Sequence, residues 1–174
     1  CSQSAVQAQI DAASDGDTVA VPAGNATWTT RIQINQKQVA VIGAGIGQTV
    51  ITDGTTVTDW DPQYVMISVS GSSGKPWRVS GFSFLALNDY CFKIGGDCKN
   101  FRVDHCRITG NGTGQYIAEI SGATYGVWDH CTFERNVEIF VRDASSSWTR
   151  PMTFGTAEAV YVEDCEYINN TELQ

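Results

Sequence analysis

The amino-acid sequence predicts an all-β fold built as a parallel β-helix, a solenoid of short strands, with a short helix at its N-terminal end. Three observations lead to this prediction: four segments share one apolar pattern, their spacing is regular, and an amphipathic segment precedes them. A period in the twenties with one longer insertion is typical of a solenoid whose loops vary along one edge. The repeated apolar position is 24, 25 and 34 residues from one segment to the next, at Val79, Val103, Trp128 and Val162.

The first element is a helix over residues 5–13. Ser4 and Gln7 fit a capping box at its start. Its apolar stripe consists of Val6, Ile10 and Ala13. We expect this helix to cover the open end of the solenoid. Short apolar segments then predict strands in the first half of the chain, at residues 18–21, 39–43, 49–52 and 65–69.

The four repeated segments predict stacked core positions. Successive strand residues point to opposite faces, so the repeated apolar position should face inward. Beyond a two-residue bend, the residues three and five places later should face inward again. The later two positions hold Phe82, Cys106, Cys131 and Cys165, and then Phe84, Ile108, Phe133 and Tyr167. Asparagines in the following turns predict a ladder of side-chain amides, at Asn88, Asn111, Asn136 and Asn170.

The residues beside the repeated apolar position should form polar columns on the outer wall. One column holds Ser80, Asp104, Asp129 and Glu163. Carboxylates on adjacent strands would lie about 4.8 Å apart, so they need a compensating cation, and clustered oxygen ligands suit Ca²⁺. The other column holds Arg78 and Arg102, whose planar guanidinium groups fit sugar carboxylates, and Tyr161, whose ring can pack on a sugar. A solvated wall of alternating charges explains the same pattern.

Composition excludes some function classes for this single domain of residues 1–174. The chain has 19 acidic and 11 basic residues and a formal charge of −8, so we expect no nucleic-acid partner. No apolar stretch is long enough for a transmembrane segment. Six cysteines and three glycosylation sequons, at Asn25, Asn111 and Asn169, favour a secreted or cell-surface protein. A disulfide between Cys91 and Cys98 across a Gly-Gly turn would lock one repeat.

Several of these motifs resemble the N-terminal part of pectate-lyase-like right-handed parallel β-helix proteins. The resemblance lies in the opening helix, in DGDTVAVPAG and VAVIGAGIGQTVI, and in the segment GVWDHC that ends at Cys131. It implies that Asp129, with Asp104 and Glu163, holds Ca²⁺, and that Arg78 or Arg102 binds the substrate carboxylate or acts as the base. An enzyme of this kind would be a calcium-dependent polysaccharide lyase or a glycoside hydrolase. Because the last repeat lies close to Gln174, we expect the C-terminal cap or further turns to be missing.

Two functions remain open from the sequence. The first is a protein that binds or cleaves an acidic polysaccharide or cell-surface glycan along the polar wall. The second is a non-catalytic adhesin, structural rod or subunit that self-associates along its axis. The insertion 143–152 contains Trp148 and Arg150, which could hold substrate, or it could be a flap that covers the core. His105 and His130 at the bends could ligate a metal, although bend histidines more often bond the backbone.

Overall fold

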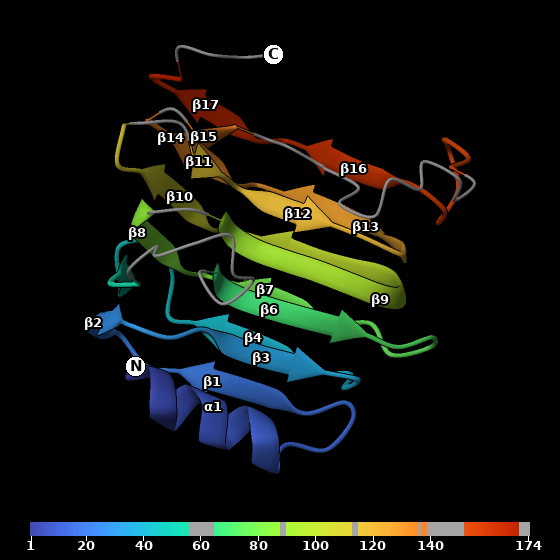
Figure 1. The fold of residues 1–174 in the computed structure, drawn as a ribbon, viewed down its shortest axis with the longest axis horizontal. Helices are drawn as coiled ribbons and strands as arrows, with labels where there is room; N and C mark the ends of the chain where they lie inside the picture. The colour runs from blue at the N-terminus through green and yellow to red at the C-terminus, as the bar shows by residue number, and fades with distance from the viewer. Residues whose placement is uncertain (56–64, 88–89, 113–114, 136, 139–151, 171–174) are drawn as a thin grey trace.

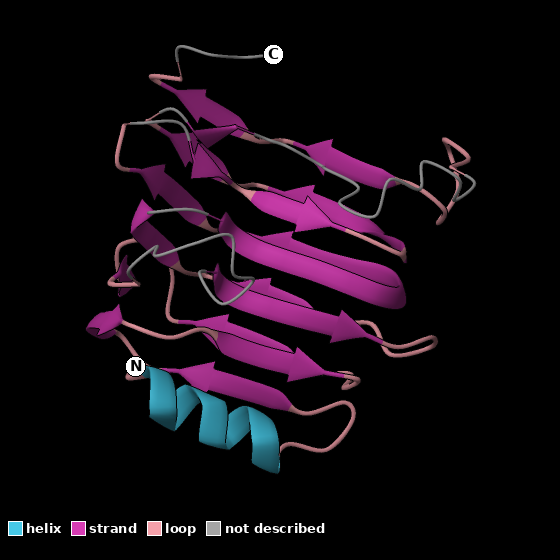
Figure 2. Ribbon diagram, in the orientation of Figure 1, coloured by secondary structure: helices cyan, strands magenta, loops and turns pink. Residues whose placement is uncertain are grey.

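The computed structural model describes residues 1–55, 65–87, 90–112, 115–135, 137–138 and 152–170. It is mostly β-structure, with parallel pairing between its main strands and one helix among the described residues. Figure 1 shows the strands stacked in one direction from the N-terminal helix, and Figure 2 shows how little helix the chain contains. This arrangement confirms an all-β fold with parallel sheets.

Most strands belong to three parallel ladders. Ladder A holds β1 (Thr18–Val21), β4 (Ala40–Gly43), β7 (Arg78–Ser80), the second part of β9 (Tyr90–Asp104), β13 (Ala123–Asp129) and β16 (Val160–Glu163). Ladder B holds β2 (Gly24–Trp28), β5 (Thr49–Asp53), β8 (Ser83–Leu87), β10 (Arg107–Gly110), β14 (Thr132–Glu134) and β17 (Glu166–Ile168). Ladder C holds β3 (Ile32–Asn35), β6 (Val65–Gly71), the first part of β9, and β12 (Ala118–Ile120). A separate short pair joins β11 (Gln115–Tyr116) to β15 (Val137–Glu138).

The chain visits these ladders in turn. β1, β2 and β3 lie in ladders A, B and C, and β4, β5 and β6 add one strand to each ladder in the same order. The long strand β9 contributes to ladder C with its first residues and to ladder A with its last. Residues about 25 positions apart therefore become direct neighbours across strands, which places equivalent side chains of the repeats in columns.

The register along ladder A is the one that the repeats predict. Val79 pairs with Val103, Val103 with Trp128, and Trp128 with Val162. The first three side chains are buried, and so are the core positions of Cys106, Cys131 and Phe133 in the neighbouring columns. These columns form one hydrophobic core, in which a buried side chain of this size contributes about 1.5–3 kcal/mol.

The last described strands depart from the predicted burial. Val162 is 39% exposed and Tyr167 is 42% exposed, whereas the equivalent Val103 and Phe133 are fully buried. The register is correct, but β16 and β17 each pair on one side only within the described residues. The neighbouring strand buries the equivalent side chains of earlier repeats, and no described strand does this for the last one.

The N-terminal helix α1 (Gln3–Ala12) begins two residues earlier than predicted. Its N-cap is Ser2, without a side-chain cap bond, so the predicted capping box at Ser4 is wrong. The Gln7 side chain bonds the backbone of Gln33 in β3 instead, accepting at 2.7 Å and donating at 3.1 Å. The apolar stripe is confirmed, because Val6 and Ile10 are buried against the first strands. No described helix is long and apolar enough to cross a membrane.

The predicted disulfide is absent from the structure. Cys91 and Cys98 are both free thiols, as are the other four cysteines. At the Gly95-Gly96 pair β9 passes from ladder C to ladder A, and Gly96 has a φ of 99°. Cys91 therefore lies in ladder C and Cys98 in ladder A, where the Cys98 thiol donates to the Lys75 carbonyl at 3.4 Å instead.

The predicted asparagine ladder lies partly outside the described residues, which exclude Asn88 and Asn136. Asn170 behaves as predicted: its side-chain amide donates to the Phe133 carbonyl of the previous repeat at 2.9 Å. This bond joins two neighbouring turns across ladder B.

Candidate functional site

Two arginines lie side by side on the outer face of ladder A. Arg78 begins β7, and its Cα partner in β9 is Arg102. Each precedes a buried valine, so alternation along the strand directs its side chain away from the core. Both side chains are 45% exposed, which leaves part of each guanidinium open to solvent. The structure thus confirms the predicted pairing of these two residues.

Asp104, predicted on the outer wall, is fully buried beneath these arginines. Arg78 donates two hydrogen bonds to its carboxylate, from Nε at 2.7 Å and from Nη2 at 2.5 Å. Ser80 donates at 3.2 Å, and the His105 Nδ1 lies 2.8 Å from Oδ2. Burial alone would raise the pKa of Asp104, but the hydrogen bonds from Arg78 and His105 outweigh it and hold this pKa below its ordinary value.

Asp129 repeats this arrangement on the next strand. Its carboxylate pairs with Arg102 through one oxygen and with the His130 Nδ1 through the other. Its side chain is 12% exposed, so it is only slightly more open than Asp104. Arg102 Nε also lies 3.7 Å from Asp104, which links the two carboxylates through one guanidinium. The result is a chain of alternating charges from Arg78 to His130.

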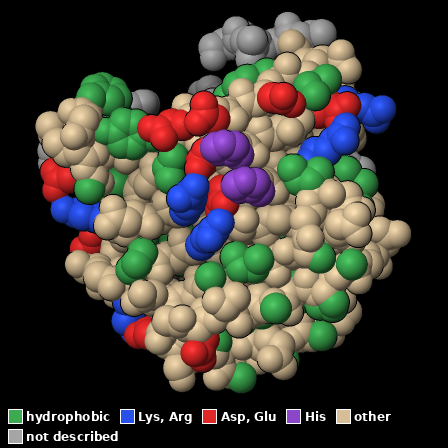
Figure 3. Space-filling model, turned by 180° about the vertical axis from the view of Figure 1, so that it is seen from behind, with side chains coloured by type: hydrophobic (Ala, Val, Ile, Leu, Met, Phe, Trp, Pro, Cys, Tyr) green, Lys and Arg blue, Asp and Glu red, His purple; other side chains and the backbone are tan. Residues whose placement is uncertain are grey.

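The two histidines stack on adjacent strands beside this chain of charges. The ring centroids of His105 and His130 are 5.1 Å apart, and their planes differ by 3°. Each ring contacts an aspartate through Nδ1 and stays more than half exposed. The hydrogen bond that the His130 ring donates to Asp129 raises the pKa of His130. Figure 3 shows the histidine, arginine and acidic side chains gathered on one face of the molecule.

A groove lies beside the arginines, where the strands of ladder A begin. It has a volume of about 260 Å³, and its lining includes Arg78, Arg102, Asn100, Gln38 and Asp17. Most of its lining is apolar surface, from residues such as Val39, Pro76 and Trp77, and the polar side chains beside them offer hydrogen-bond donors and acceptors of the kind that hydroxyl-rich ligands need. The groove was not foreseen from the sequence, because it depends on how the segments before three different strands meet.

The acidic column fits a resident Ca²⁺ ion poorly in this arrangement. Asp104 directs both oxygens to Arg78, and Asp129 directs its oxygens to Arg102 and His130. Ca²⁺ takes 6–8 oxygen ligands, and a guanidinium bound to the same carboxylates opposes its charge. Glu163, the third predicted ligand, pairs in register with Asp129 and is exposed. The protein thus supplies its own cations for the two buried carboxylates.

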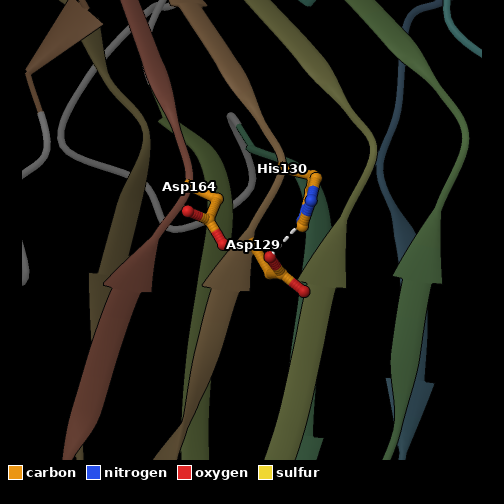
Figure 4. A group of neighbouring side chains, drawn as sticks. All are labelled: Asp129, His130 and Asp164. Atoms are coloured by element: carbon orange, nitrogen blue, oxygen red, sulfur yellow. Dashed lines mark hydrogen bonds and ion pairs between the residues drawn. The ribbon is translucent and has the colours of Figure 1, made fainter.

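A different group gathers around the last of these bends. Asp129, His130 and Asp164 each offer one metal-ligating atom within 4.8 Å of the other two. Figure 4 shows the His130 ring bonded to Asp129, while Asp164 approaches from the turn after the neighbouring strand. His130 and Asp164 are exposed, and Asp129 is buried. Oxygen and nitrogen atoms so arranged can accept protons, hydrogen bonds or a metal ion.

Of the three predicted substrate-binding residues, the structure describes Tyr161. Tyr161 lies on ladder A two strands from Arg102, with Val127 between them. Its hydroxyl accepts a hydrogen bond from Gly155 N at 2.7 Å and donates one to Thr156 O at 3.0 Å, so the loop fixes its ring. Trp148 and Arg150 lie outside the described residues. The predicted glycosylation residues Asn25, Asn111 and Asn169 are all exposed.

The contact between each bend histidine and the aspartate before it was not predicted from the sequence. The dipeptide Asp-His occurs at 104–105 and again at 129–130, one repeat apart. The sequence left the histidines open as metal ligands or as bend residues that bond the backbone, and in the structure their Nδ1 atoms contact the preceding aspartates. The repeated dipeptide was the available signal.

Comparison with known proteins gives no relative: no family model, no curated protein and no solved structure matches this chain.

Proposed function

We propose that this chain is a right-handed parallel β-helix whose outer face on ladder A binds an acidic polysaccharide. The β-helix is supported by the order in which the strands join the ladders, because each pass through A, B and C adds one parallel strand to each. The burial of equivalent side chains in columns supports it as well.

The binding face is supported above all by the in-register pair Arg78 and Arg102. The two arginines lie on adjacent strands, which are about 4.8 Å apart, and each side chain is 45% exposed. Buried Asp104 fixes Arg78 through two hydrogen bonds, so little side-chain freedom is lost when a ligand binds. A planar guanidinium matches the two oxygens of a sugar carboxylate. An acidic polymer carries such carboxylates on successive sugars, and this face carries arginines on two successive strands.

The groove beside the arginines supports a polysaccharide rather than a small anion. Asn100, Gln38 and Asp17 line it together with both arginines. Amide and carboxylate side chains bond sugar hydroxyls, while the arginines meet the carboxylate of the same or the next sugar. Tyr161, further along ladder A, offers a fixed ring for a more distant unit.

The raised pKa of Arg78 favours binding over cleavage. Its hydrogen bonds to Asp104 raise the pKa of Arg78, and a general base needs the opposite shift. Cleavage by β-elimination would leave Arg102 as the candidate base. A Ca²⁺ ion at Asp129 and Glu163 would then have to displace Arg102 from Asp129. The non-catalytic alternative requires no such rearrangement.

The proposal implies a secreted or cell-surface protein, because acidic polysaccharides occur outside cells and at cell surfaces. The exposure of the three sequon asparagines supports this location. The negative charge of the chain supports the absence of a nucleic-acid partner.

Calorimetric titration with oligogalacturonate tests the proposal, with a neutral glucan of similar length as the ligand control. Arg102→Ala should weaken binding about tenfold or more, because a charge-assisted contact contributes roughly 1.5–3 kcal/mol. Arg107→Ala is the matched control: Arg107 is 42% exposed and pairs with Glu134, but it lies on ladder B. Equal losses for both variants, or equal binding of the neutral glucan, would overturn the proposal. Ultraviolet absorbance of unsaturated products, with and without chelator, separates cleavage from binding.

Self-association is the second candidate function, because most of the exposed large apolar side chains lie close together in the chain. Of the five among the described residues, four lie within residues 152–167: Met152 at 40%, Phe154 at 76%, Val162 at 39% and Tyr167 at 42%. Exposed apolar surface of this kind is typical of interaction sites. Light scattering over a range of concentrations should then detect oligomers that Tyr167→Ser and Phe154→Ser weaken. A monomer at all concentrations would reject this candidate.

A further inference from the structure

Three consecutive strands of ladder A end in the same left-handed bend. His105, His130 and Asp164 follow β9, β13 and β16 with φ of 50°, 49° and 49°. Histidine and aspartate are among the residues that tolerate this backbone region. The backbone N–H of His105 donates to Asp129 O at 3.1 Å, and that of His130 donates to Glu163 O at 3.3 Å. The three bends are therefore fixed in register, and we call these residues the bend column.

The side chains of the bend column lie close to one another. The rings of His105 and His130 are stacked 5.1 Å apart. One ligand atom of His130 lies within 4.8 Å of a carboxylate oxygen of Asp164. The histidine side chains are 58% and 54% exposed, so both rings are open to a cation from solvent.

Both histidines are already oriented as metal ligands usually are. Metal-bound histidine generally donates its second ring N–H to a carboxylate, which fixes the tautomer and makes the free nitrogen more basic. Here Asp104 contacts the Nδ1 of His105, and Asp129 contacts the Nδ1 of His130. This leaves Nε2 of each ring for a ligand. Asp104 and Asp129 are buried, so these supporting contacts are held by the sheet.

From this geometry we propose that the bend column is a binding site for a borderline divalent cation such as Zn²⁺, held by His105, His130 and Asp164. Two imidazole nitrogens and one carboxylate are a ligand set that suits Zn²⁺ and its neighbours in the first transition row, with water in the remaining position. The set does not suit Ca²⁺, which takes oxygen ligands. The site adjoins the arginines, because Asp104 and Asp129 each contact an arginine and a histidine, but its ligands are not the residues proposed to hold the glycan.

Titration of untagged protein with ZnCl₂ alone tests the site, by calorimetry and by ¹⁵N spectra of the histidine rings. The chain contains two histidines, so both ring signals can be assigned. We expect one equivalent of zinc, with both Nε2 signals shifted and both Nδ1 atoms still protonated. His130→Ala, His105→Ala and Asp164→Asn should each weaken binding about tenfold or more.

Two controls distinguish this site from other zinc binding. Asp97→Asn removes an exposed carboxylate elsewhere in β9 and should bind zinc like the parent protein. Cys165→Ser removes a half-buried thiol next to Asp164 and should have little effect. Zinc binding that survives His105→Ala and His130→Ala but is lost with Cys165→Ser would overturn the proposal. Unchanged ring signals at saturating zinc would overturn it equally, whatever heat is measured.

Discussion

Ladders A and B each contain an arginine that pairs with a carboxylate on the next strand, but the two pairs have different surroundings. On ladder A, Arg78 is 45% exposed and its partner Asp104 is fully buried. On ladder B, Arg107 is 42% exposed and its partner Glu134 is 13% exposed. The arginines are alike, so the difference lies in the carboxylates. The short aspartate stays against the sheet, where Ser80 and His105 also bond it.

The surroundings of an ion pair decide whether it forms part of a binding site. On ladder B, the Thr109 hydroxyl also donates to Glu134, at 3.4 Å. The pair on ladder A is repeated by Arg102 and Asp129, is flanked by stacked histidines, and borders a groove. A buried carboxylate orients its arginine but leaves the exposed guanidinium surface to a ligand. We therefore expect substitutions on ladder A to affect both stability and binding, and substitutions on ladder B to affect stability alone.

The largest expected effect is the loss of the buried carboxylate. Asp104→Ala should lower the free energy of unfolding by about 1.5–3 kcal/mol, because it removes the hydrogen bonds that the buried carboxylate accepts from Arg78 and Ser80. Glu134→Ala should cost about 1 kcal/mol, as more exposed pairs do. Urea unfolding of the two variants beside the parent protein measures both values. Equal losses would mean that burial does not distinguish the two ladders.

The next effect concerns glycan affinity. Asp104→Asn keeps the size of the side chain but removes the charge that fixes Arg78, so the affinity for oligogalacturonate should fall severalfold. Glu134→Gln should leave this affinity unchanged, because Arg107 is on the other ladder. Titration calorimetry on both folded variants is the measurement. A loss of affinity with Glu134→Gln would show that binding does not depend on the face that carries the arginine.

A smaller effect should follow from replacing the guanidinium by an amine. Arg78→Lys retains the charge but loses the two-bond contact with Asp104, which should cost about 1 kcal/mol of stability. Arg107→Lys should cost less, because Glu134 is less buried. Thermal unfolding measures the stability of both variants. A larger loss of stability for Arg107→Lys than for Arg78→Lys would contradict the proposed difference between the two ladders.

The smallest expected difference is in the response to acid. The pKa of Asp104 lies below its ordinary value in the folded protein, so its contribution to stability is present above the unfolded pKa of about 3.9 and is lost as the pH falls through the folded value. Hydrogen bonds from Arg107 lower the pKa of Glu134 in the same direction. Between about pH 5 and pH 2, Asp104→Asn should therefore lose less stability than the parent protein. An identical slope for both would refute this role of Asp104.

The sequence predicts the register of the molecule well, because register follows from the repeats. Superposing the repeated segments pairs Arg78 with Arg102 and Asp104 with Asp129, and the strands pair in this way. The apolar columns are predicted for the same reason, since alternation fixes which side of a strand meets the core. The exposure of Val162 departs from this pattern because burial also needs a neighbour on the far side.

The candidate site is predicted less well, because it depends on side-chain conformations that repeats do not specify. The aspartates were expected to face solvent and attract a cation, but arginines one strand earlier fold over them. The same alignment that gave the register contained this offset, with each arginine two positions before the carboxylate on the following strand. The helix start was wrong because Ser2, and not Ser4, is the N-cap. The predicted disulfide is absent although the chain turns at the glycine pair, because Cys91 lies in ladder C and Cys98 in ladder A.

The most direct test of the central claim follows the arginine Nε–H signals by NMR while oligogalacturonate is added. Binding on the outer face of ladder A predicts that the Nε–H signals of Arg78 and Arg102 shift in a saturable way, while that of Arg107 stays in place. A shift confined to Arg107, or equal small shifts of every arginine, would contradict the account, because it would mean that the polymer meets the protein elsewhere or without a defined site.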